Sequence, residues 1–411
     1  MSEKYIFSAA DILIPNFSPA SEDFAKWAVI ACDQFTSDVS YWDKTESLIG
    51  TSPSTYDYIL PEAYLETPRA DMKTESFKAK MAEINSSVLN PATPAVSGFV
   101  YIERTLSDGK IRRGILGKLD LCEYDYAADS RSSIRATEQT VAERIPPRSA
   151  LRAMASVEFP HAMVFTDDKT SLFEKTAEIA ASCSVIYDFD LMQGGGHIKG
   201  YKIEGEAAER LQSLIAENER ASALPYAVGD GNHSLAAAKV LYTEISEKFG
   251  EESMSHPARH ALCEIVSIYD DAIEFEPIHR IVKNVNVAEL LSALASIAQA
   301  GGGEQSIRVI TADAENVFAF TKTSHDMTVG TLQNFIDDYI SSHPGTVCDY
   351  IHGEEELRAL VLENSVAFMF DGFDKSQLFS YIKNGPMPRK TFSMGDARSK
   401  RYYLEGRVIV K

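Results

Sequence analysis

One short stretch, residues 226–239, constrains the fold of this chain more than any other part of its sequence. Its apolar start, residues 226–228, predicts the end of a β-strand, and the alanine-rich run after Ser234 predicts an α-helix. Between the two, Gly229 and Gly231 permit backbone conformations and close approaches that a side chain would block. We therefore expect a strand that passes through a tight turn directly into the N-terminus of a helix.

Two interpretations of this turn are open from the local sequence. The N–H groups of a helix N-terminus lie at the positive end of the helix dipole, where they bind anions, and phosphate most of all. Alternatively, Asp230, Asn232 or Ser234 caps the helix with a side-chain oxygen, and the turn serves stability alone. The residue types favour neither interpretation over the other.

The turn also resembles a known element. Residues 231–237, Gly-Asn-His-Ser-Leu-Ala-Ala, are similar to the G-x-H-R-x-x-A element of sulfiredoxins, ParB-type nucleotide-binding domains and free-serine kinases of the ParB-like superfamily. The resemblance implies that N–H groups from Gly231 to Ser234 hold nucleotide phosphates, with His233 as a neutral donor or transition-state stabiliser. Ser234 stands where many relatives carry Arg, so a cation for the phosphates must come from elsewhere. The candidates are Lys239, Arg259, Arg280 and Lys390.

Further motifs are spread along nearly the whole chain. They are Ile134-Arg135-Ala136-Thr137-Glu138-Gln139-Thr140, Glu143-Arg144-Ile145-Pro146-Pro147-Arg148, Gly194-Gly195-Gly196-His197, Pro277-Ile278-His279-Arg280 and Met387-Pro388-Arg389-Lys390-Thr391. Together with the turn, they resemble the uncharacterised bacterial family of domains of unknown function numbered 1015 (DUF1015). In that family the turn is typically Asp-Gly-(His or Asn)-His-(Arg or Ser), which residues 230–234 match.

The length, charge and cysteines of the chain narrow its class. At 411 residues it is too long for one small core, so two domains are expected. The formal net charge of −20 argues against a nucleic-acid partner, because binding to a phosphate backbone needs clustered Lys and Arg. No stretch approaches the roughly 20 apolar residues of a membrane span, and the N-terminus lacks a signal-peptide pattern. Five scattered cysteines without a C-x-x-C pair indicate reduced thiols, so we expect a cytoplasmic protein.

Two acidic residues are candidates for catalysis. Asp33 follows the apolar run 27–31 in a predicted loop at a strand end, a usual place for functional residues in α/β proteins. It matches an acidic position of the resembled family, and a turn-forming role is the alternative. Glu138 has three arginines within a few turns, Arg135, Arg144 and Arg148. This pattern predicts either a structural ion-pair network or a general base whose neighbouring arginines hold an anionic substrate.

Other basic segments are candidates for contacts with a substrate or phosphate. The loop at Gly194-Gly195-Gly196-His197 predicts either a cradle in which His197 contacts the ligand or a flexible hinge, and it lacks the spacing of a Walker A loop. The resemblance implies that Arg280 and Lys390 reach a phosphate or substrate, although an isolated His-Arg pair is more often a surface contact. The last basic run, residues 398–401, predicts a solvated loop.

Strands and helices alternate through the chain, so we predict an α/β (mixed α+β) fold with two lobes. Residues 1–286 would form the first lobe, containing the ParB/sulfiredoxin-like nucleotide-binding unit that the resemblance implies. Residues 287–411 would form a smaller α/β lobe, with a glycine loop at 301–303 near the boundary. The 385–392 loop of the smaller lobe is expected to return to the site.

The resemblance and these residues predict a nucleotide-dependent phosphotransferase acting on a small hydroxylated metabolite, with serine or a related hydroxy amino acid as first candidate. ATP or ADP would bind at Asp230, Gly231, Asn232, His233 and Ser234, and Asp230 would position Mg²⁺. Catalysis would use Glu138 or Asp33 as proton acceptor and His233 as donor. The substrate would be held by Arg135, Arg148, His197, Arg280 and Lys390.

Two other functions use the same turn. A nucleotide- or metabolite-binding regulator would hold phosphate there without a catalytic base. A hydrolase or lyase of phosphorylated metabolites would hold the phosphate of its own substrate there. Both require the same anion-binding backbone, so the sequence of the turn does not separate them from a kinase.

Overall fold

The computed structural model describes residues 5–65, 67–84, 88–90, 92–138, 140, 142, 145–383 and 385–410. The chain divides into two compact units, of which the first comprises Met1–Ile273 and Asp396–Lys411 and the second Glu274–Gly395. The sequence-based division lay at residue 286. The observed division lies earlier because β14 (Glu276–Lys283) pairs with strands of the second unit, while the last residues of the chain belong to the first. Both units contain helices and strands, which confirms the mixed α/β fold.

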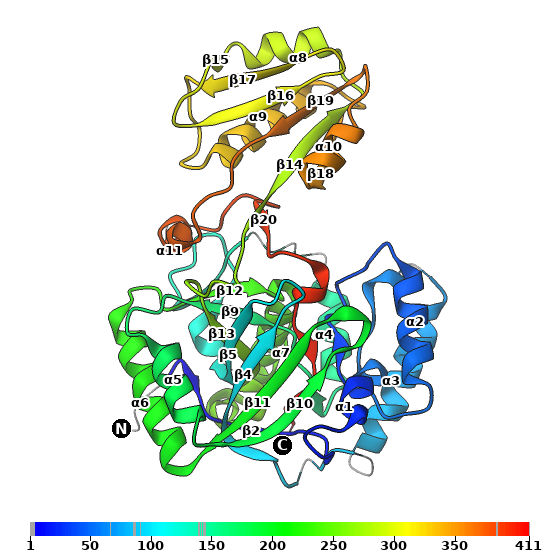
Figure 1. The fold of residues 1–411 in the computed structure, drawn as a ribbon, viewed down its shortest axis with the longest axis vertical. Coiled ribbons are helices and arrows are strands. Elements are labelled where there is room, and N and C mark those ends of the chain that lie inside the picture. The colour runs from blue at the N-terminus through cyan, green and yellow to red at the C-terminus, as the bar shows by residue number, and fades with distance from the viewer. Residues whose placement is uncertain are drawn as a thin grey trace. The chain divides into compact units, whose positions relative to one another are not determined.

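A mixed sheet of eleven strands in the described residues forms the centre of the first unit (Figure 1). Nine of these strands follow the path β10 (Ser184–Asp190), β11 (His197–Glu204), β4 (Val96–Thr105), β5 (Ile111–Asp120), β13 (His260–Ser267), β9 (Met163–Thr166), β12 (Tyr226–Asp230), β7 (Ile134–Ala136) and β6 (Tyr124–Asp125). The other two lie off this path, since β1 (Phe7–Ser8) pairs with β5 and β2 (Ala10–Ile12) with β4. Three neighbouring pairs are parallel, namely β12–β7, β13–β9 and β6–β7.

Each face of this sheet packs into its own core, because successive side chains of a strand point to opposite faces. On β13, Cys263 and Ile265 join one core, whereas Leu262 joins the other. Helices of the first core are α5 (Leu172–Ala180), α6 (Gly205–Ala221) and α7 (Asn232–Phe249). Helices of the second are α1 (Glu22–Trp27), α2 (Val39–Ile49) and α3 (Arg69–Glu83), while α4 (Ile145–Ala153) packs against α7.

Two short antiparallel ladders bring the end of the chain into the first unit. The strand β3 (Val29–Ile30) pairs with β21 (Tyr402–Tyr403), and β8 (Val157–Glu158) pairs with β22 (Arg407–Val408). The first ladder pairs Tyr402 with Ile30 and the second pairs Arg407 with Glu158, so residues far apart in the sequence lie side by side. The ladders also decide which side chains surround the predicted turn.

The second unit is built on a seven-stranded sheet within the described residues. Its path is β15 (Ala298–Ala300), β17 (Glu315–Phe320), β16 (Ser306–Ile310), β19 (Ser365–Met369), β14 and β18 (Val347–His352), and β20 (Phe392–Ser393) pairs with β14. Its helices are α8 (Val287–Leu294), α9 (Thr328–Ser342), α10 (Glu354–Ala359) and α11 (Leu378–Ile382). The buried residues Ile281, Leu357 and Met369 form part of its core.

Two further features bear on the class of protein. All five cysteines are free thiols, at Cys32, Cys122, Cys183, Cys263 and Cys348. Among the described residues, no helix combines the length and the apolar character needed to cross a bilayer.

Candidate functional site

The turn after β12 has the backbone that the sequence predicted. The strand lies between β7 and β9 and ends at Asp230, and α7 begins at Asn232. Gly231 joins the two with a φ of 78°, in the left-handed region that favours glycine. A Cβ at Gly231 would lie 2.9 Å from Ala162 Cα, so the neighbouring backbone also excludes a side chain. The predicted strand, glycine turn and helix are therefore confirmed.

The helix starts without a side-chain cap. Its N-cap residue is Gly231, which corrects the interpretation that Asp230, Asn232 or Ser234 caps α7. Asp230 Oδ1 instead accepts a hydrogen bond from the N–H of Gly231 at 3.0 Å. Asp230 Oδ2 and Asn232 Oδ1 are buried and accept no hydrogen bond from the described residues. Because buried polar atoms normally have a partner, these two oxygens indicate a place for a donor or a cation.

A lysine that the sequence did not select lies at this turn. Lys400 Nζ is 3.6 Å from Asp230 Oδ2, and each side chain is only 13% exposed. Two of the cations considered from the sequence are engaged elsewhere, since Lys239 donates to the carbonyl of Leu121 at 2.8 Å and Arg259 lies 2.5 Å from an Asp120 oxygen. Among the described residues, Lys400 therefore supplies a positive charge that can neutralise an anion at the start of α7.

The run that contains Lys400 is not the solvated loop that we predicted. Arg401 is buried, pairs with Glu264 and lies 2.5 Å from a carboxylate oxygen of Glu405. The cause is the ladder between β21 and β3, which pairs Tyr402 with Ile30 and draws the preceding residues inward. A tertiary pairing has overridden the solvation that a run of basic residues indicates.

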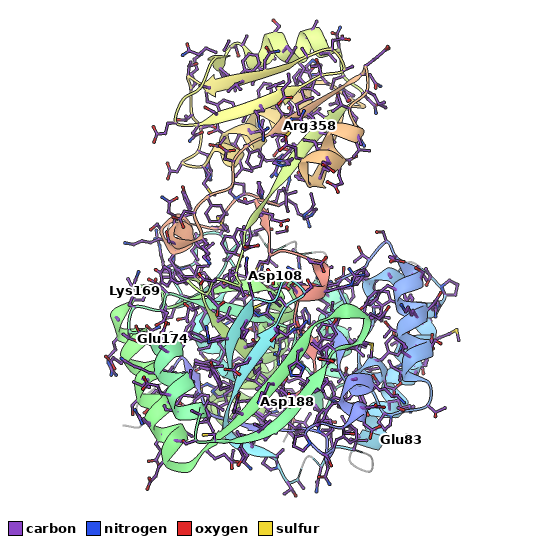
Figure 2. All side chains as sticks on the ribbon, viewed as in Figure 1. Glu83, Asp108, Lys169, Glu174, Asp188 and Arg358 are labelled. Atoms are coloured by element: carbon purple, nitrogen blue, oxygen red, sulfur yellow. The ribbon has the colours of Figure 1, made fainter. Side chains whose placement is uncertain are left out.

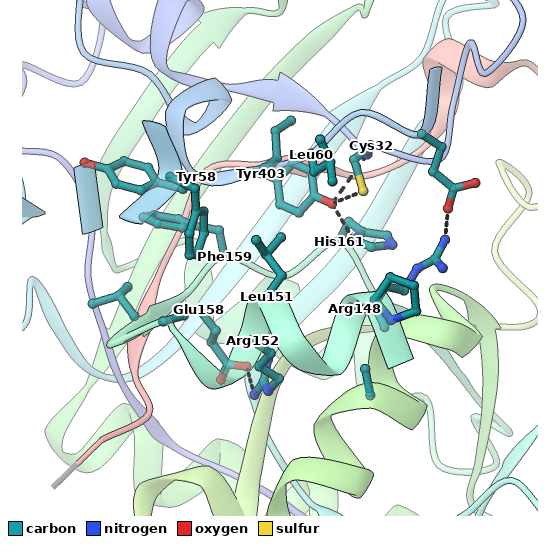
Figure 3. A pocket seen from close by; sticks show the side chains of 18 of the residues that line it. Cys32, Tyr58, Leu60, Arg148, Leu151, Arg152, Glu158, Phe159, His161 and Tyr403 are labelled. Atoms are coloured by element: carbon teal, nitrogen blue, oxygen red, sulfur yellow. Dashed lines mark hydrogen bonds and ion pairs between the residues drawn. The ribbon is translucent and has the colours of Figure 1, made fainter. Parts of the chain in front are cut away.

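Asp33 lies in a small polar cluster at the end of β3. Its Oδ2 is 3.8 Å from His161 Nε2, and its Oδ1 accepts a hydrogen bond from Gln34 Nε2 at 3.0 Å. The other nitrogen of His161, Nδ1, is 2.7 Å from the Tyr403 hydroxyl. That hydroxyl also donates to Cys32 Sγ at 3.1 Å (Figure 3). Segments from three distant parts of the chain thus meet around one carboxylate.

The charges around this cluster set its protonation states. Burial by itself raises the pKa of Asp33, but the charges of His161, Lys400 and Arg148 and a hydrogen bond from the next residue lower it below 3.8. Burial and the nearby charge of Asp33 raise the pKa of Cys32 to about 12. At neutral pH, Asp33 is therefore a carboxylate that can accept a proton. Cys32 stays a thiol and is not a nucleophile.

Arg148 faces the same cluster from α4. It forms an ion pair with Glu62, for which the sequence gave no signal, and the two side chains are 23% and 17% exposed (Figure 3). The charge of Arg148 also lowers the pKa of Asp33, so the sequence-selected Arg148 and Asp33 do come together. A guanidinium already paired with a carboxylate is less available to clamp a substrate anion.

Glu138 lies at the same edge of the sheet as the turn. The strands β7 and β12 run parallel, and Thr137 Oγ1 donates to the carbonyl of Val228 at 2.7 Å. Glu138 follows Thr137 directly in the chain, two residues after the end of β7. Its neighbour Arg144 lies outside the described residues.

Two predicted substrate contacts have other partners in the first unit. Arg135 lies within β7, and its Nε donates to the carbonyl of Ser132 at 3.0 Å. His197 begins β11, five steps along the sheet path from β12. Its ring nitrogens lie 2.7 Å from Asp188 and from Asp190 on the β10–β11 hairpin, where Figure 2 labels Asp188. The triple-glycine loop therefore presents His197 to these two carboxylates.

The last two predicted substrate contacts belong to the second unit. Arg280 is fully buried, and its guanidinium donates to the carbonyls of Arg389 and Lys390 at 2.9 Å each and to Gln333 Oε1 at 3.1 Å. It also lies over the rings of Tyr350 and Phe370. These contacts explain why the His-Arg and Pro-Arg-Lys motifs occur together, because the arginine of the first holds the loop of the second.

A cavity of about 150 Å³ adjoins the polar cluster. Ser234 and Ala237 of α7 line it, which connects it with the start of that helix. The polar residues at this end are Cys32, Glu62, Arg148, His161 and Tyr403. Four residues of this region were not selected from the sequence: Glu62, His161, Lys400 and Tyr403. Only Lys400 had a local signal, because it lies in the basic run 398–401.

We compared the chain with models of protein families, with curated proteins and with solved structures. The family model described as "Protein of unknown function (DUF1015)" matches residues 17–366, and no curated protein matches. A conserved hypothetical protein from Pyrococcus furiosus is similar at 11% identity and a TM-score of 0.36, covering 70% of this chain and 93% of that chain. SbnI from Staphylococcus aureus, truncated at its C-terminus, is similar at 10% identity and a TM-score of 0.37, covering 70% and 85%. A free serine kinase in complex with AMP gives 10% identity, a TM-score of 0.37 and coverage of 70% and 90%.

Proposed function

This chain belongs to the DUF1015 family, and we propose that it is a cytoplasmic, nucleotide-dependent phosphotransferase acting on a small hydroxylated metabolite. The observation that carries the proposal is the meeting of Asp230, Lys400 and the uncapped start of α7. Backbone N–H groups and an ammonium group are donors for phosphate oxygens, whereas a carboxylate at the same place requires a cation between it and a phosphate. A nucleotide polyphosphate with a divalent cation meets both requirements.

The proposed phosphate site is formed mainly by backbone. The N–H groups of Asn232, His233 and Ser234 stand in the first turn of an 18-residue helix, where the dipole favours negative charge. Lys400 supplies the positive side chain that Ser234 lacks. The resemblance of residues 231–237 to a phosphate-binding element supports the same assignment.

The residues at the turn fit a magnesium ion bound together with phosphate. Asp230 Oδ2, which lies 3.6 Å from Lys400 Nζ, and Asn232 Oδ1 are buried acceptors without a hydrogen bond from the described residues, so both have the capacity to bind a metal ion. In the part of the chain that the structure describes, no group of three or more His, Cys, Asp or Glu side chains could hold a metal alone. This suits Mg²⁺, which usually takes one or two protein oxygens and completes its shell with phosphate and water. When bound, the ion would neutralise negative charge on the phosphates.

Asp33 is the proposed proton acceptor. It is ionised at neutral pH, and it lies 3.8 Å from His161, whose charge contributes to its lowered pKa. A carboxylate of this kind orients a substrate hydroxyl and takes its proton as the oxygen attacks phosphorus. Glu138, at the end of β7, is the second carboxylate at this edge of the sheet and remains the rival for the same role.

Binding of ADP in the presence of Mg²⁺ tests the proposed site. Replacing Lys400 with glutamine removes a charged donor to phosphate, so we expect the Kd for ADP to rise about 10- to 100-fold, from roughly 1.5–3 kcal/mol of lost interaction. Isothermal titration calorimetry on the full chain measures both the affinity and the requirement for Mg²⁺.

Lys248→Gln is the matched control for this experiment. Lys248 is an exposed residue in the last turn of α7, roughly 25 Å from the first turn at 1.5 Å per residue. The same charge change at that end should leave the Kd for ADP unchanged within a factor of two. If the parent protein binds no ADP, or if both variants bind it as the parent does, the proposed phosphate site is wrong.

A further inference from the structure

The cavity beside α7 has mostly apolar walls. Leu151 projects from α4 toward Leu60 and Tyr403 in the close view of Figure 3. Further apolar lining residues include Tyr58, Phe77, Phe159 and Ile409. They come from separate segments of the first unit, so they enclose a space between elements. An apolar enclosure with a few polar groups is typical of a small-molecule site.

The arginine and glutamate side chains that line this cavity form oppositely charged pairs. Arg148 pairs with Glu62, and Arg152 Nη2 lies 2.5 Å from Glu158. Burial by itself raises the pKa of Glu158, but Arg152 and Arg407 lower it, so the carboxylate stays ionised as their partner. A charged group that entered the cavity would lose its hydration without gaining a counter-ion. The part of a ligand that fills this space is therefore neutral.

The size and direction of the cavity narrow the ligand further. Its volume of about 150 Å³ matches that of an engineered apolar cavity, roughly 150 Å³, that stays dry and binds benzene. The end nearest the proposed phosphate site carries Ser234 and His161, and His161 adjoins Asp33. A ligand with its apolar body in the cavity would thus present its polar end to the catalytic carboxylate.

We propose that the phosphoryl acceptor is a neutral alcohol with a compact apolar body, a single aromatic ring or a branched alkyl chain, and not a free hydroxy amino acid. This assignment rests on the proposed phosphotransferase function. The alcohol oxygen forms a bond to the γ-phosphorus of a nucleoside triphosphate, and the bond from that phosphorus to the β–γ bridging oxygen breaks. The hydroxyl proton passes to the carboxylate of Asp33. The nucleoside diphosphate leaves with the bridging oxygen and its electron pair.

The test compares benzyl alcohol and isoamyl alcohol with L-serine as acceptors, with ATP and Mg²⁺. Ala155 is buried in the cavity wall, whereas Ala153 at the end of α4 is exposed. Ala155→Trp therefore fills the cavity, and Ala153→Trp makes the same change outside it. We expect kcat/KM to be at least about tenfold higher for one of the alcohols than for serine. Ala155→Trp should lower kcat/KM for that alcohol by about tenfold or more, and Ala153→Trp should leave it unchanged.

Separate binding measurements keep the two proposals apart. ADP affinity is measured by calorimetry, and alcohol binding by ligand-observed NMR. If ADP binds but neither alcohol is phosphorylated, or if serine is the better acceptor, the alcohol assignment is overturned and the nucleotide site stands. If an alcohol binds the parent and not Ala155→Trp while ADP does not bind, the phosphotransferase fails and the cavity remains a site for neutral apolar ligands. If Ala155→Trp does not fold, Leu60→Trp fills the cavity from another wall and is judged by the same ratios.

Discussion

Replacing Arg401 with methionine is expected to lower the free energy of unfolding by about 3–5 kcal/mol. The guanidinium is 2% exposed and pairs with Glu264 and Glu405, which are 2% and 0% exposed. Methionine keeps much of the volume but leaves two carboxylates in a low-dielectric interior without a counter-ion. Thermal unfolding of the full chain followed by circular dichroism measures the effect. At roughly 2–4 °C per kcal/mol for a domain of this size, we expect the Tm to fall by about 10 °C.

Buried arginines hold the segment that contains Lys400, the lysine of the proposed phosphate site. Arg104 Nη2 donates to the carbonyl of Arg398 at 3.0 Å, and Arg112 Nη1 donates to the carbonyl of Ser399 at 2.7 Å. Arg401 anchors the other side of Lys400. We therefore expect Arg401→Met to weaken ADP binding as well, because the ammonium group loses its fixed position beside Asp230.

Arg210→Met is the control for this prediction. Arg210 is an exposed residue of α6, and exposed substitutions of this kind usually change stability by less than about 0.5 kcal/mol. Equal free energies of unfolding for the Arg401 and Arg210 variants would show that the buried ion pairs make no net contribution to the stability of the fold. That result would remove the explanation for the inward path of residues 398–401.

Replacing Asp33 with asparagine is expected to lower kcat about 10²- to 10⁴-fold, the usual contribution of a positioned general base. The side chain keeps its shape and its hydrogen-bonding oxygen but can no longer accept a proton. Because Asp33 lies beside His161 and not in the first turn of α7, the Kd for ADP should change by less than about threefold. Steady-state turnover with ATP measures kcat, and calorimetry with ADP measures the Kd.

Glu138→Gln decides between the two candidate bases. If turnover falls in this variant and not in Asp33→Asn, the base is Glu138 and the assignment to Asp33 is wrong.

The dependence of kcat/KM on pH gives a second test of Asp33 as the base. The charges of His161, Lys400 and Arg148 lower the pKa of Asp33 below that of an ordinary aspartate against the effect of burial, so it stays ionised to lower pH. Loss of kcat/KM through protonation of Asp33 is therefore expected to begin at a lower pH than for a base with the pKa of an ordinary aspartate.

Local patterns predicted the centre of the fold but not the surroundings of the site. The strand, glycine turn and helix around Gly231 follow from apolar spacing and from the conformational freedom of glycine, which both act over a few residues. Lys400 and Tyr403 reach the turn only because β21 pairs with β3 across the length of the chain. A two-residue strand has no sequence pattern that selects its partner, so no local reasoning could find this pairing.

Some of the candidate residues lie near the proposed site, whereas others have structural partners elsewhere. Arg148 and Lys400 both lower the pKa of Asp33, and Lys400 Nζ also lies 3.6 Å from Asp230 Oδ2. His197 instead faces two carboxylates on a hairpin, and Arg280 is buried under the loop that it stabilises. Histidine and arginine in glycine- or proline-rich motifs satisfy structural needs as readily as catalytic ones. Their residue types alone did not distinguish the two roles.

A crystal structure of the protein with ADP and Mg²⁺ tests the central claim most directly. We predict phosphate oxygens at the N–H groups of Asn232, His233 and Ser234, with Lys400 Nζ within hydrogen-bonding distance of one of them. The ion should lie between the phosphates and Asp230. Phosphates bound away from α7, or a first turn of α7 closed by protein groups while ADP is bound elsewhere, would contradict the claim.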